Sequence, residues 1–329
     1  MALRFLMLAA ILLGLVTSGP VLATEPSASD DSPGIAHQGA DTYTVMIGDI
    51  RVTSLSDGTV PQDLHKLLHG ISNERIDAML KQAYLTNPVE ASINAFLLEM
   101  GNRLILVDTG VGELFGPGLG NMLIASLHAA GVEPEQISDV LLTHVHSDHM
   151  GGLTRDGEAV FPNATIHIGK PDVDFFLNRQ NATNTDYDRH YFDQAITVLT
   201  PYIDAGKVSS FDRATEILPG LTASLHPGHT PGSAFYTLES QGQRLTFIGD
   251  ILHVAAIQLP EPSVTIAYDV NPERAASVRS KAFSTFAEDA ELVAAPHMPF
   301  PGIGHIRKAR EGYDWLPIEY GNRTVTEAR

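Results

Sequence analysis

Apolar residues recur along the chain with two different spacings, one typical of strands and the other of helices. Short runs rich in Val, Ile, Leu and Phe predict strands at residues 43–50, 51–55, 95–99, 104–107, 140–143, 164–168, 221–225, 234–238, 245–248 and 292–295. Longer segments with apolar residues three or four apart predict helices at residues 71–84, 120–130, 171–180, 187–199 and 272–290. Because strands and helices alternate in both halves, we expect an α/β fold in which two sheets are faced by helices.

Small polar residues and glycine interrupt these runs where the chain is expected to turn. Ser56-Asp57-Gly58 predicts a turn after the second strand, and Met100-Gly101-Asn102-Arg103 predicts a hairpin between the next two. No interior segment has the composition of a linker between independent domains. We therefore predict a single domain over residues 42–329.

The first residues follow the pattern of a secretory signal peptide. Arg4 precedes an uncharged apolar run of about 12 residues, and Val21-Leu22-Ala23 matches a small-residue cleavage site. A membrane-spanning helix needs roughly 20 apolar residues, so the run is too short for one. We predict a signal peptide over residues 1–23, a flexible arm over residues 24–41, and a protein that is periplasmic or secreted after cleavage near Ala23. An uncleaved N-terminal anchor is the alternative.

Acidic residues outnumber basic ones by a wide margin. The chain has 39 Asp and Glu against 21 Lys and Arg, which gives a formal net charge of −18. Such a balance disfavours nucleic acid and anionic membranes as partners, so we expect a small-molecule substrate. The chain has no cysteine, which excludes disulfides, thiolate metal ligands and thiol nucleophiles together.

Four side chains that can bind metals lie directly after the strand predicted at 140–143. They are His144, His146, Asp148 and His149. His144 and His146 are two residues apart, so on an extended segment their side chains point to the same side. Asp148 and His149 follow where a loop or a helix start can direct them towards a second centre. Solvated loops rarely concentrate ligands in this way, and the segment therefore predicts a metal site.

Three further ligands are expected beyond other strands. His229 lies in a loop rich in Gly and Pro, Asp250 follows the strand at 245–248, and His297 follows the strand at 292–295. A carboxylate directly after a buried strand, as at Asp250, is suited to bridging two ions. Three other histidines leave structural and supporting roles open: His226, His253 and His305.

Five histidines and two aspartates suit two divalent ions that share a bridging ligand. Ligation by nitrogen and oxygen alone favours Zn²⁺, with Mn²⁺, Fe²⁺ and Co²⁺ as alternatives. A pair of ions generates hydroxide near neutral pH and polarises the oxygen under attack, and Asp250 would hold that bridge. A mononuclear centre with a conventional base is the weaker interpretation.

These motifs resemble the signature of the metallo-β-lactamase superfamily, His-x-His-x-Asp-His followed by His, Asp and His. All seven residues occur in this order, and Asp108-Thr109-Gly110 is similar to an early turn of the same superfamily. The resemblance implies that the single catalytic domain is an αββα sandwich with the site at one edge. It also assigns ligands to two ions, the first with His144, His146 and His229, the second with Asp148, His149 and His297, and both with Asp250.

Within the superfamily, the chain resembles the methyl parathion hydrolase family from about residue 43 to residue 320. The segments at residues 55–60, 104–110, 114–117 and 299–306 carry this resemblance. It implies a homodimer, and a leaving-group pocket lined by three aromatic side chains: Phe115, Phe176 and Phe192. Ordinary core packing is the alternative role for these phenylalanines.

The function that we predict is hydrolysis of aryl phosphotriesters of the methyl parathion type, by attack of a hydroxide that bridges the two ions. An aryloxide is a good leaving group and needs little acid assistance. The same site could open a lactone or an aryl ester, so a lactonase or carboxylic ester hydrolase is the alternative. A β-lactamase is less consistent because many place cysteine at the second zinc, and a redox diiron protein would carry more carboxylate ligands.

Overall fold

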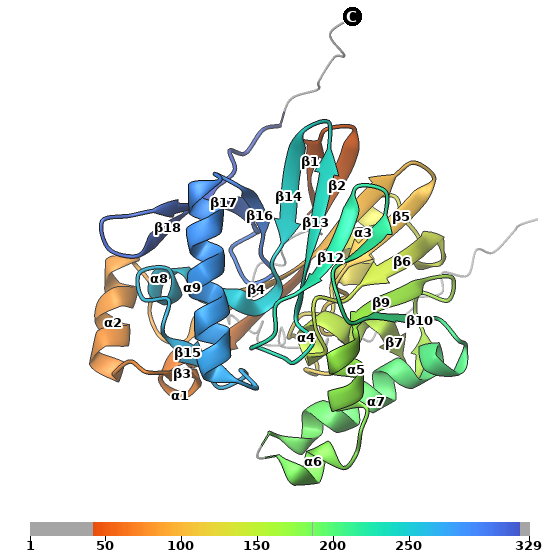
Figure 1. Ribbon diagram of the computed structural model, residues 1–329, viewed down its shortest axis with the longest axis horizontal. Coiled ribbons are helices and arrows are strands. Elements are labelled where there is room, and N and C mark those ends of the chain that lie inside the picture. The colour runs from red at the N-terminus through yellow and green to blue at the C-terminus, as the bar shows by residue number, and fades with distance from the viewer. Residues whose placement is uncertain (1–41, 186, 323–329) are drawn as a thin grey trace, which may run out of the picture. The chain divides into compact units, whose positions relative to one another are not determined.

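The computed structural model describes residues 42–185 and 187–322 of the 329-residue chain. The signal peptide predicted over residues 1–23 and the arm predicted over residues 24–41 lie outside the described residues. Two large sheets with helices on their outer faces make up the described part (Figure 1).

The first sheet has the strand order β1-β2-β4-β5-β6-β9-β10. Strands from β1 to β5 pair antiparallel, whereas β5, β6, β9 and β10 pair parallel. Their bounds are β1 (Thr42–Ile47), β2 (Ile50–Gln62), β4 (Val89–Met100), β5 (Arg103–Val107), β6 (Ile137–Leu141), β9 (Thr165–Gly169) and β10 (Val208–Phe211).

The second sheet has the order β11-β12-β13-β14-β16-β17-β18 and is antiparallel except for the parallel pair β14 and β16. Its strands are β11 (Thr215–Leu218), β12 (Leu221–Leu225), β13 (Ala234–Ser240), β14 (Gln243–Phe247), β16 (Leu292–Ala294), β17 (Ile303–Lys308) and β18 (Tyr313–Pro317). Two small ribbons pair β3 (Leu68–His69) with β15 (Thr265–Ile266), and β7 (Thr154–Arg155) with β8 (Glu158–Ala159).

The α-helices are α1 (Leu64–Leu67), α2 (Asn73–Gln82), α3 (Leu123–Ala129), α4 (Ser147–Met150), α5 (Lys170–Phe176), α6 (Asn181–Asn184), α7 (Arg189–Asp204), α8 (Ala255–Gln258) and α9 (Pro272–Glu288). Short 3₁₀ turns lie at η1 (Pro134–Gln136), η2 (Gly151–Leu153) and η3 (Gly249–Ile251). The longest helix, α9, is capped by Asn271, whose side chain accepts a hydrogen bond from the Arg274 amide at 3.0 Å. None of the helices among the described residues is long and apolar enough to cross a membrane.

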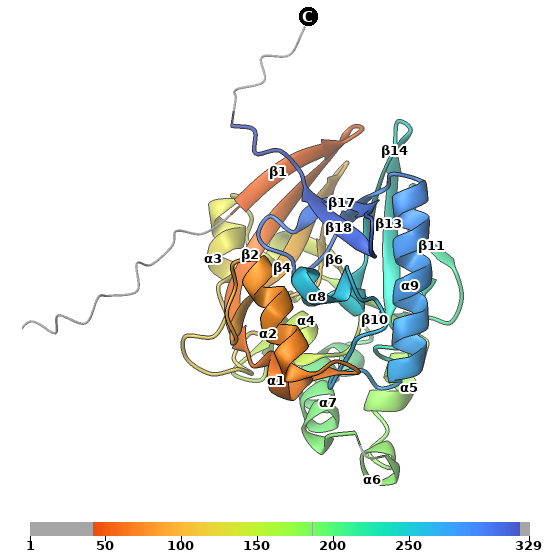
Figure 2. The same cartoon turned by 90° about the vertical axis from the view of Figure 1, so that its left-hand side faces the viewer.

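Strand β4 shows how the layers are built. Ala95 and Leu97 point towards the core under the helices of the first sheet, whereas Phe96 and Leu98 point into the core between the two sheets. Because both faces of this strand are buried, its apolar run is continuous rather than alternating. Helices α3 and α9 cover opposite outer faces, with the sheets between them (Figure 2). The layers are those of the αββα sandwich that the sequence resemblance implied.

The turn predicted at Ser56-Asp57-Gly58 is wrong. Strand β2 continues through this segment, and its pairing with β4 shifts register between Ser56 and Gly58, so the residues form a β-bulge. Polar and glycine residues produce the same sequence pattern in a bulge as in a turn. The sequence also missed the edge strands β10, β11 and β18, which are only partly buried, and the inner strand β17, because none of the four has a long apolar run.

The parallel strands determine where the chemistry lies. Strands β5 and β6 run parallel in one sheet, and β14 and β16 run parallel in the other. Carboxyl ends of parallel strands meet at one edge of a sheet, and the segments that follow these four strands carry most of the predicted ligands. Side chains from distant parts of the sequence therefore converge at a single edge.

Candidate metal centre

The segment after β6 is extended and then turns into a short helix. Thr143 donates its backbone N–H to Asp108 at 2.8 Å, and Val145 donates its own to Asp172 at 3.0 Å. His146 precedes helix α4, and its carbonyl accepts the amides of His149 and Met150. The change from extended chain to helix brings Asp148 and His149 to Asp250 and His297, while the His149 ring stays 4.0 Å from that of His144.

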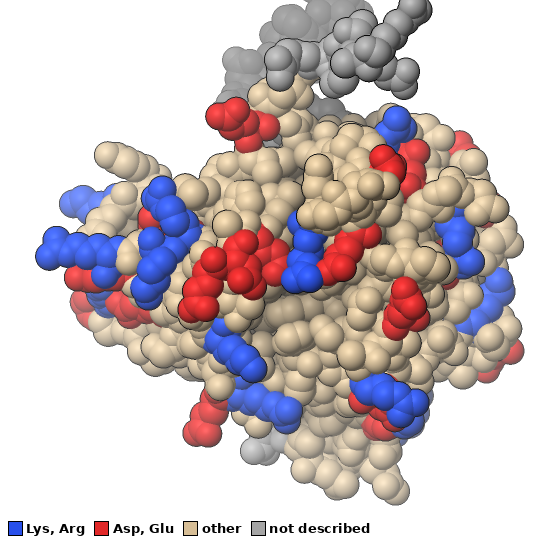
Figure 3. All heavy atoms as spheres, turned by 45° about the horizontal axis from the view of Figure 1, so that its top comes forward, with Lys and Arg blue, Asp and Glu red and all other residues tan. Residues whose placement is uncertain are grey.

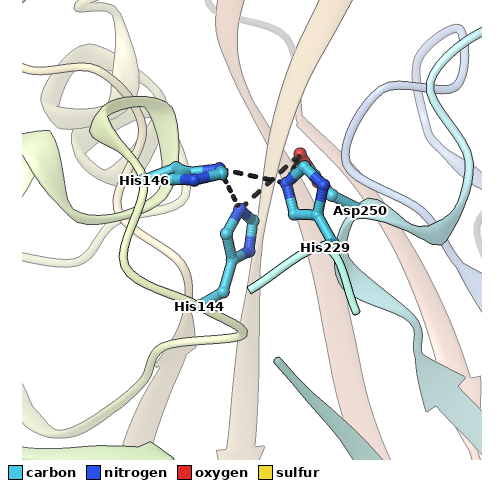
Figure 4. A group of neighbouring side chains, drawn as sticks. All are labelled: His144, His146, His229 and Asp250. Atoms are coloured by element: carbon cyan, nitrogen blue, oxygen red, sulfur yellow. Dashed lines mark hydrogen bonds and ion pairs between the residues drawn. The ribbon is translucent and has the colours of Figure 1, made fainter. Parts of the chain in front are cut away.

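Four side chains converge in the first group: His144, His146, His229 and Asp250 (Figure 4). Nδ1 of His146 lies 3.0 Å from Nε2 of His144 and 3.0 Å from Nε2 of His229. Oδ2 of Asp250 lies 3.7 Å from Nε2 of His144 and 3.4 Å from Nε2 of His229. A tetrahedral zinc ion with bonds of about 2.0–2.1 Å sets its ligand atoms about 3.3 Å apart, so the spacing suits one ion.

The second group consists of Asp148, His149, Asp250 and His297. Nε2 of His149 lies 3.1 Å from Oδ1 of Asp250, and Nε2 of His297 lies 3.1 Å from Oδ2. The Asp148 carboxylate is 3.7 Å from His149 and 3.5 Å from His297. Asp250 therefore faces both groups, which is the placement that a bridging ligand requires.

Among the buried atoms at this site that have no hydrogen-bond partner in the described residues are Nε2 of His149 and Oδ1 of Asp250. Leaving a buried polar atom unpaired costs about 1–3 kcal/mol, so a missing partner is implied. A divalent cation between the two atoms would serve both at once. The nitrogen and oxygen donors, their spacing and their unpaired state all fit two divalent ions.

The outer nitrogen of each predicted histidine ligand is also engaged. His149 donates to Asp108 at 2.9 Å and His229 to Asp269 at 2.8 Å. His297 donates to the Ser92 carbonyl at 2.9 Å. The remaining two pairs are His144 with the Thr143 hydroxyl at 3.1 Å and His146 with the Tyr187 hydroxyl at 2.6 Å. Such partners fix the tautomer and ring orientation of a metal-binding histidine.

Asp172 joins two of the ligand loops. Its carboxylate accepts from Val145 at 3.0 Å, from the Thr230 hydroxyl at 2.8 Å and from the Gly232 amide at 2.5 Å. Burial raises the pKa of Asp172 to about 6, although these hydrogen bonds oppose the shift. The segments that carry His146 and His229 are therefore held by the same buried carboxyl group.

Burial and neighbouring carboxylates divide the histidines into two electrostatic classes. Burial lowers the pKa of His144 and of His146 well below the ordinary value, and repulsion from other histidines of the cluster adds to this. Burial also acts to lower the pKa of His149 and His229. Nearby carboxylates, above all Asp250, outweigh it, and the pKa of His149 is raised well above its ordinary value and that of His229 to about 9. Because the pKa of His149 and of His229 is raised, a metal ion must displace a proton from each of them in order to bind.

A cavity of about 440 Å³ opens directly onto the cluster. Its floor includes Asp148, Asp250 and His297. One wall is apolar and consists of Val60, Pro61, Leu114, Phe115 and Leu119. The polar part of the lining includes Gln62, His190, Tyr191, Gln194 and Tyr268. No lysine or arginine of the described residues lines this cavity.

Only one of the three predicted pocket phenylalanines lines the cavity, namely Phe115. Phe176 and Phe192 are fully buried in the core under the first sheet and do not line the cavity. The ring of Phe176 packs edge-on against His146 with centroids 5.9 Å apart, which supports the ligand from behind. Tyr191 and Tyr268 provide aromatic surface at the cavity instead.

The three histidines whose roles the sequence left open have different surroundings. His253 is buried beside the cluster, and its Nε2 lies 3.1 Å from Oδ2 of Asp250. His226 stacks on Phe235 at 3.7 Å, and burial lowers its pKa to about 4. His305 lines a separate hollow of about 770 Å³, which shares no lining residue with the cavity at the metal cluster. Only His253 belongs to the site.

Sequence reasoning missed the residues that support the ligands, namely Thr143, Asp172, Tyr187 and Asp269. Asp172 and Thr230 are 58 residues apart, and Tyr187 and His146 are 41 apart. Nothing in the local pattern around these residues indicates such a contact. Asp108 was noticed as part of a motif, and the structure adds that its carboxylate supports His149 and Thr143.

The fold and the cluster together define a metal-dependent hydrolase with room for two ions. Residues 89–297 match the model of the metallo-β-lactamase superfamily, and the chain belongs to that superfamily.

Two solved structures resemble the chain over nearly its whole described length. The hydrolase AbOPH of the β-lactamase superfamily is 34% identical, with a TM-score of 0.82 over 87% of this chain and 100% of that one. AidC, a dizinc quorum-quenching lactonase in complex with a homoserine product, is 26% identical, with a TM-score of 0.80 over 86% of this chain and 99% of that one.

Matches to curated proteins are shorter. An N-acyl homoserine lactonase of Bacillus thuringiensis is 27% identical over 173 residues, which is 46% of this chain and 61% of that protein. A ribonuclease of Thermus thermophilus is 27% identical over 188 residues, which is 53% of this chain and 38% of that protein. The chain thus matches only about half the length of these relatives.

Proposed function

We propose that this protein hydrolyses uncharged esters, with lactones and aryl esters as the preferred class, in a reaction that depends on two divalent ions. The observation that carries the proposal is the cavity of about 440 Å³ that opens onto the metal cluster without a lysine or arginine in its described lining. A pocket of this size suits a small molecule.

The lack of a cationic side chain argues against negatively charged substrates. A β-lactam antibiotic carries a carboxylate and an RNA strand carries phosphates, and both kinds of anion are usually held by arginine or lysine. Among the described residues the cavity offers hydroxyl, amide and imidazole groups and apolar surface. An uncharged ester needs no counter-charge beyond the metal cluster.

Residues of this chain divide the work at the site. Asp250 faces the first group of ligands through Oδ2 and the second group through both of its oxygens. When bound, a pair of divalent ions supplies an activated water and an electrophilic contact for the ester oxygen. The apolar wall with Phe115 excludes water from the departing group, and Tyr191 and Tyr268 add aromatic surface to the same cavity.

The relatives support lactones as the first choice, since AidC and the Bacillus protein are both described as lactonases. Aryl phosphotriesters are the second candidate. They are also uncharged, and the aromatic surface of Phe115, Tyr191 and Tyr268 suits an aryl leaving group. With Phe176 and Phe192 in the core, this aromatic surface differs from the one that the sequence predicted.

The proposal is tested by comparing kcat/KM for γ- and δ-lactones, aryl esters, aryl phosphotriesters and β-lactams, with the metal content measured in each preparation. We expect turnover of lactones and aryl esters that disappears on removal of metal and returns with Zn²⁺, Mn²⁺ or Co²⁺. Faster turnover of phosphotriesters would favour the second candidate. A preference for the β-lactam, or turnover in metal-free protein, would contradict the proposal.

We further propose export and a homodimeric state. On the face drawn in Figure 3, acidic and basic side chains are intermingled and form no continuous basic patch, which is consistent with a small-molecule rather than a nucleic-acid partner. Determining the N-terminus of the protein from the periplasm or medium tests cleavage near Ala23. Sedimentation equilibrium tests the dimer, and a mass of 35.5 kDa or less at all concentrations would contradict it.

A further inference from the structure

His146 differs from most of the other ligands in the group that holds its outer nitrogen. His149 and His229 are held by carboxylates and His297 by a backbone carbonyl, whereas Nε2 of His146 lies 2.6 Å from the hydroxyl of Tyr187. A phenol has a single proton to donate. Which partner receives this proton decides the tautomer of His146.

The second contact of Tyr187 resolves the question. Its hydroxyl lies 2.8 Å from the backbone carbonyl of Tyr268, and a carbonyl can only accept. Tyr187 must therefore donate its proton to Tyr268, because otherwise two oxygens would face each other without a hydrogen. The phenolic oxygen then accepts from His146, so the proton of this ring is on Nε2.

This tautomer leaves Nδ1 of His146 with a free lone pair. Nδ1 lies 3.0 Å from Nε2 of His144 and 3.0 Å from Nε2 of His229, at the centre of the first group of ligands. The opposite tautomer would direct an N–H at the ion. Tyr187 thus favours the one form of His146 that can bind metal.

The residue after Tyr268 holds another histidine of the first group of ligands. Asp269 accepts from Nδ1 of His229 at 2.8 Å, and the amide of Val270 donates to the His229 carbonyl at 2.8 Å. The segment is fixed in turn by the amide of Ile266, which donates to the second oxygen of Asp269 at 3.0 Å. Consecutive residues therefore support two of the three histidines of the first group.

We propose that Tyr187 is the positioning residue of His146, and that Tyr268 and Asp269 form a common support for the first metal site. Tyr268 supports His146 through the Tyr187 hydroxyl, and Asp269 supports His229 directly. The inference rests on the proposed function only in that ions occupy the two groups of ligands. It predicts that loss of the Tyr187 hydroxyl weakens the binding of an ion by the first group of ligands and leaves binding by the second group unchanged.

The chain offers a closely matched control. Tyr191 stacks on Tyr187 with centroids 5.0 Å apart and also packs against His146 at 5.0 Å. Its hydroxyl makes no hydrogen bond with any residue that the structure describes, so Tyr191→Phe removes an oxygen from the same aromatic cluster without touching the tautomer. Tyr187→Phe removes both the contact to His146 and the contact to Tyr268.

The first experiment is carried out on metal-free protein with ¹⁵N-labelled histidine, in which long-range correlations distinguish the two tautomers. His146→Gln assigns the signals. In the wild type we expect His146 with its proton on Nε2, and in Tyr187→Phe a mixture of tautomers. A wild-type His146 with its proton on Nδ1 would overturn the proposal, whether or not any variant folds.

The second experiment measures the release of each ion to a chelator from the metal-loaded protein. Loss of a partner to a metal-binding histidine typically costs about 10–100-fold in affinity, and we expect this for one equivalent in Tyr187→Phe and for neither in Tyr191→Phe. Equal retention in Tyr187→Phe and wild type, or equal loss in both variants, would refute the positioning role. Neither readout depends on turnover, so each can fail or succeed independently of the proposed ester hydrolysis.

Discussion

Asp57 holds the apolar wall of the cavity in place, and its replacement by asparagine tests this role. The carboxylate is buried at the bulge of β2 and accepts from the amides of Val111 and Leu123 at 2.8 Å each. These amides flank the segment that carries Leu114, Phe115 and Leu119. At Gly110 a Cβ would overlap the Asp57 carboxyl group, which shows how closely the segment is seated.

The free energy of Asp57→Asn has two terms of opposite sign. The amide keeps one accepting oxygen and turns its NH₂ towards the other backbone N–H, and the resulting unsatisfied contact costs about 1–3 kcal/mol at any pH. Against this, burial raises the pKa of Asp57 from an ordinary 3.8 to about 6, despite the hydrogen bonds that act to lower it. Asparagine has no charge, so it avoids the cost of burying a carboxylate that raises this pKa.

The pH trend follows from the raised pKa. A carboxyl group whose pKa is higher in the folded state contributes stability that is fully present below pH 3.8 and is lost as the pH rises through 6. For these two values the contribution falls by about 1 kcal/mol between pH 5 and pH 7.5. The free energy of unfolding of the wild type should therefore decrease by that amount relative to Asp57→Asn.

The assay is urea unfolding of wild type and variant at several pH values, both with chelator so that metal binding cancels. Asp204→Asn, at an exposed position at the end of α7, is the control and should show no such trend. If the free energy of unfolding of the wild type instead increased relative to Asp57→Asn as the pH rises, the reasoning would be refuted. The hydrogen bonds to the carboxylate would then outweigh its burial. With metal restored, Asp57→Asn should raise KM more than it lowers kcat, since the wall moves while the ligands do not.

Three further outcomes follow from the site. Asp250→Asn should lower turnover by about 100-fold or more and reduce the metal content while the circular dichroism spectrum stays that of the wild type; unchanged turnover would remove the bridging role. Phe192→Ala should cost about 3–5 kcal/mol of unfolding free energy without changing the ratio of kcat/KM for aryl substrates to kcat/KM for alkyl substrates. Phe115→Ala should change that ratio and cost less stability. Apparent metal affinity should fall by more than about tenfold from pH 9 to pH 6, because the pKa of His229 is raised to about 9 and its proton competes with the ion; calorimetry that shows constant affinity would contradict this.

The metal ligands could be predicted from the sequence because their signals are local. His144 and His146 are close together after an apolar strand, and Asp250 and His297 each follow a strand whose last residues are buried. Burial on both faces makes such strands recognisable without a structure. Once the strands are placed, the parallel pairs bring their carboxyl ends to one edge, and the ligands follow.

The substrate pocket could not be predicted in the same way. An apolar side chain in a helix can line a cavity or fill the core, and the sequence pattern is the same for both. Phe176 and Phe192 lie on α5 and α7, which pack against each other and turn both rings into the core under the first sheet. Tyr191, next to Phe192 on α7, faces the cavity instead. A difference of one helical position decides between the two roles.

The buried aspartates show why the support of the site was hidden. An aspartate outside an apolar run is usually interpreted as part of a turn, as the sequence predicted for Asp57, or as surface charge. Here Asp57, Asp108, Asp172 and Asp269 are all buried, and each accepts from groups far away in the sequence. A buried carboxylate is tolerated only where hydrogen bonds satisfy it, so each one must join the segments whose donors it accepts. Part of the net charge of −18 therefore belongs to the interior, where it joins the loops that carry the ligands rather than repelling anions at the surface.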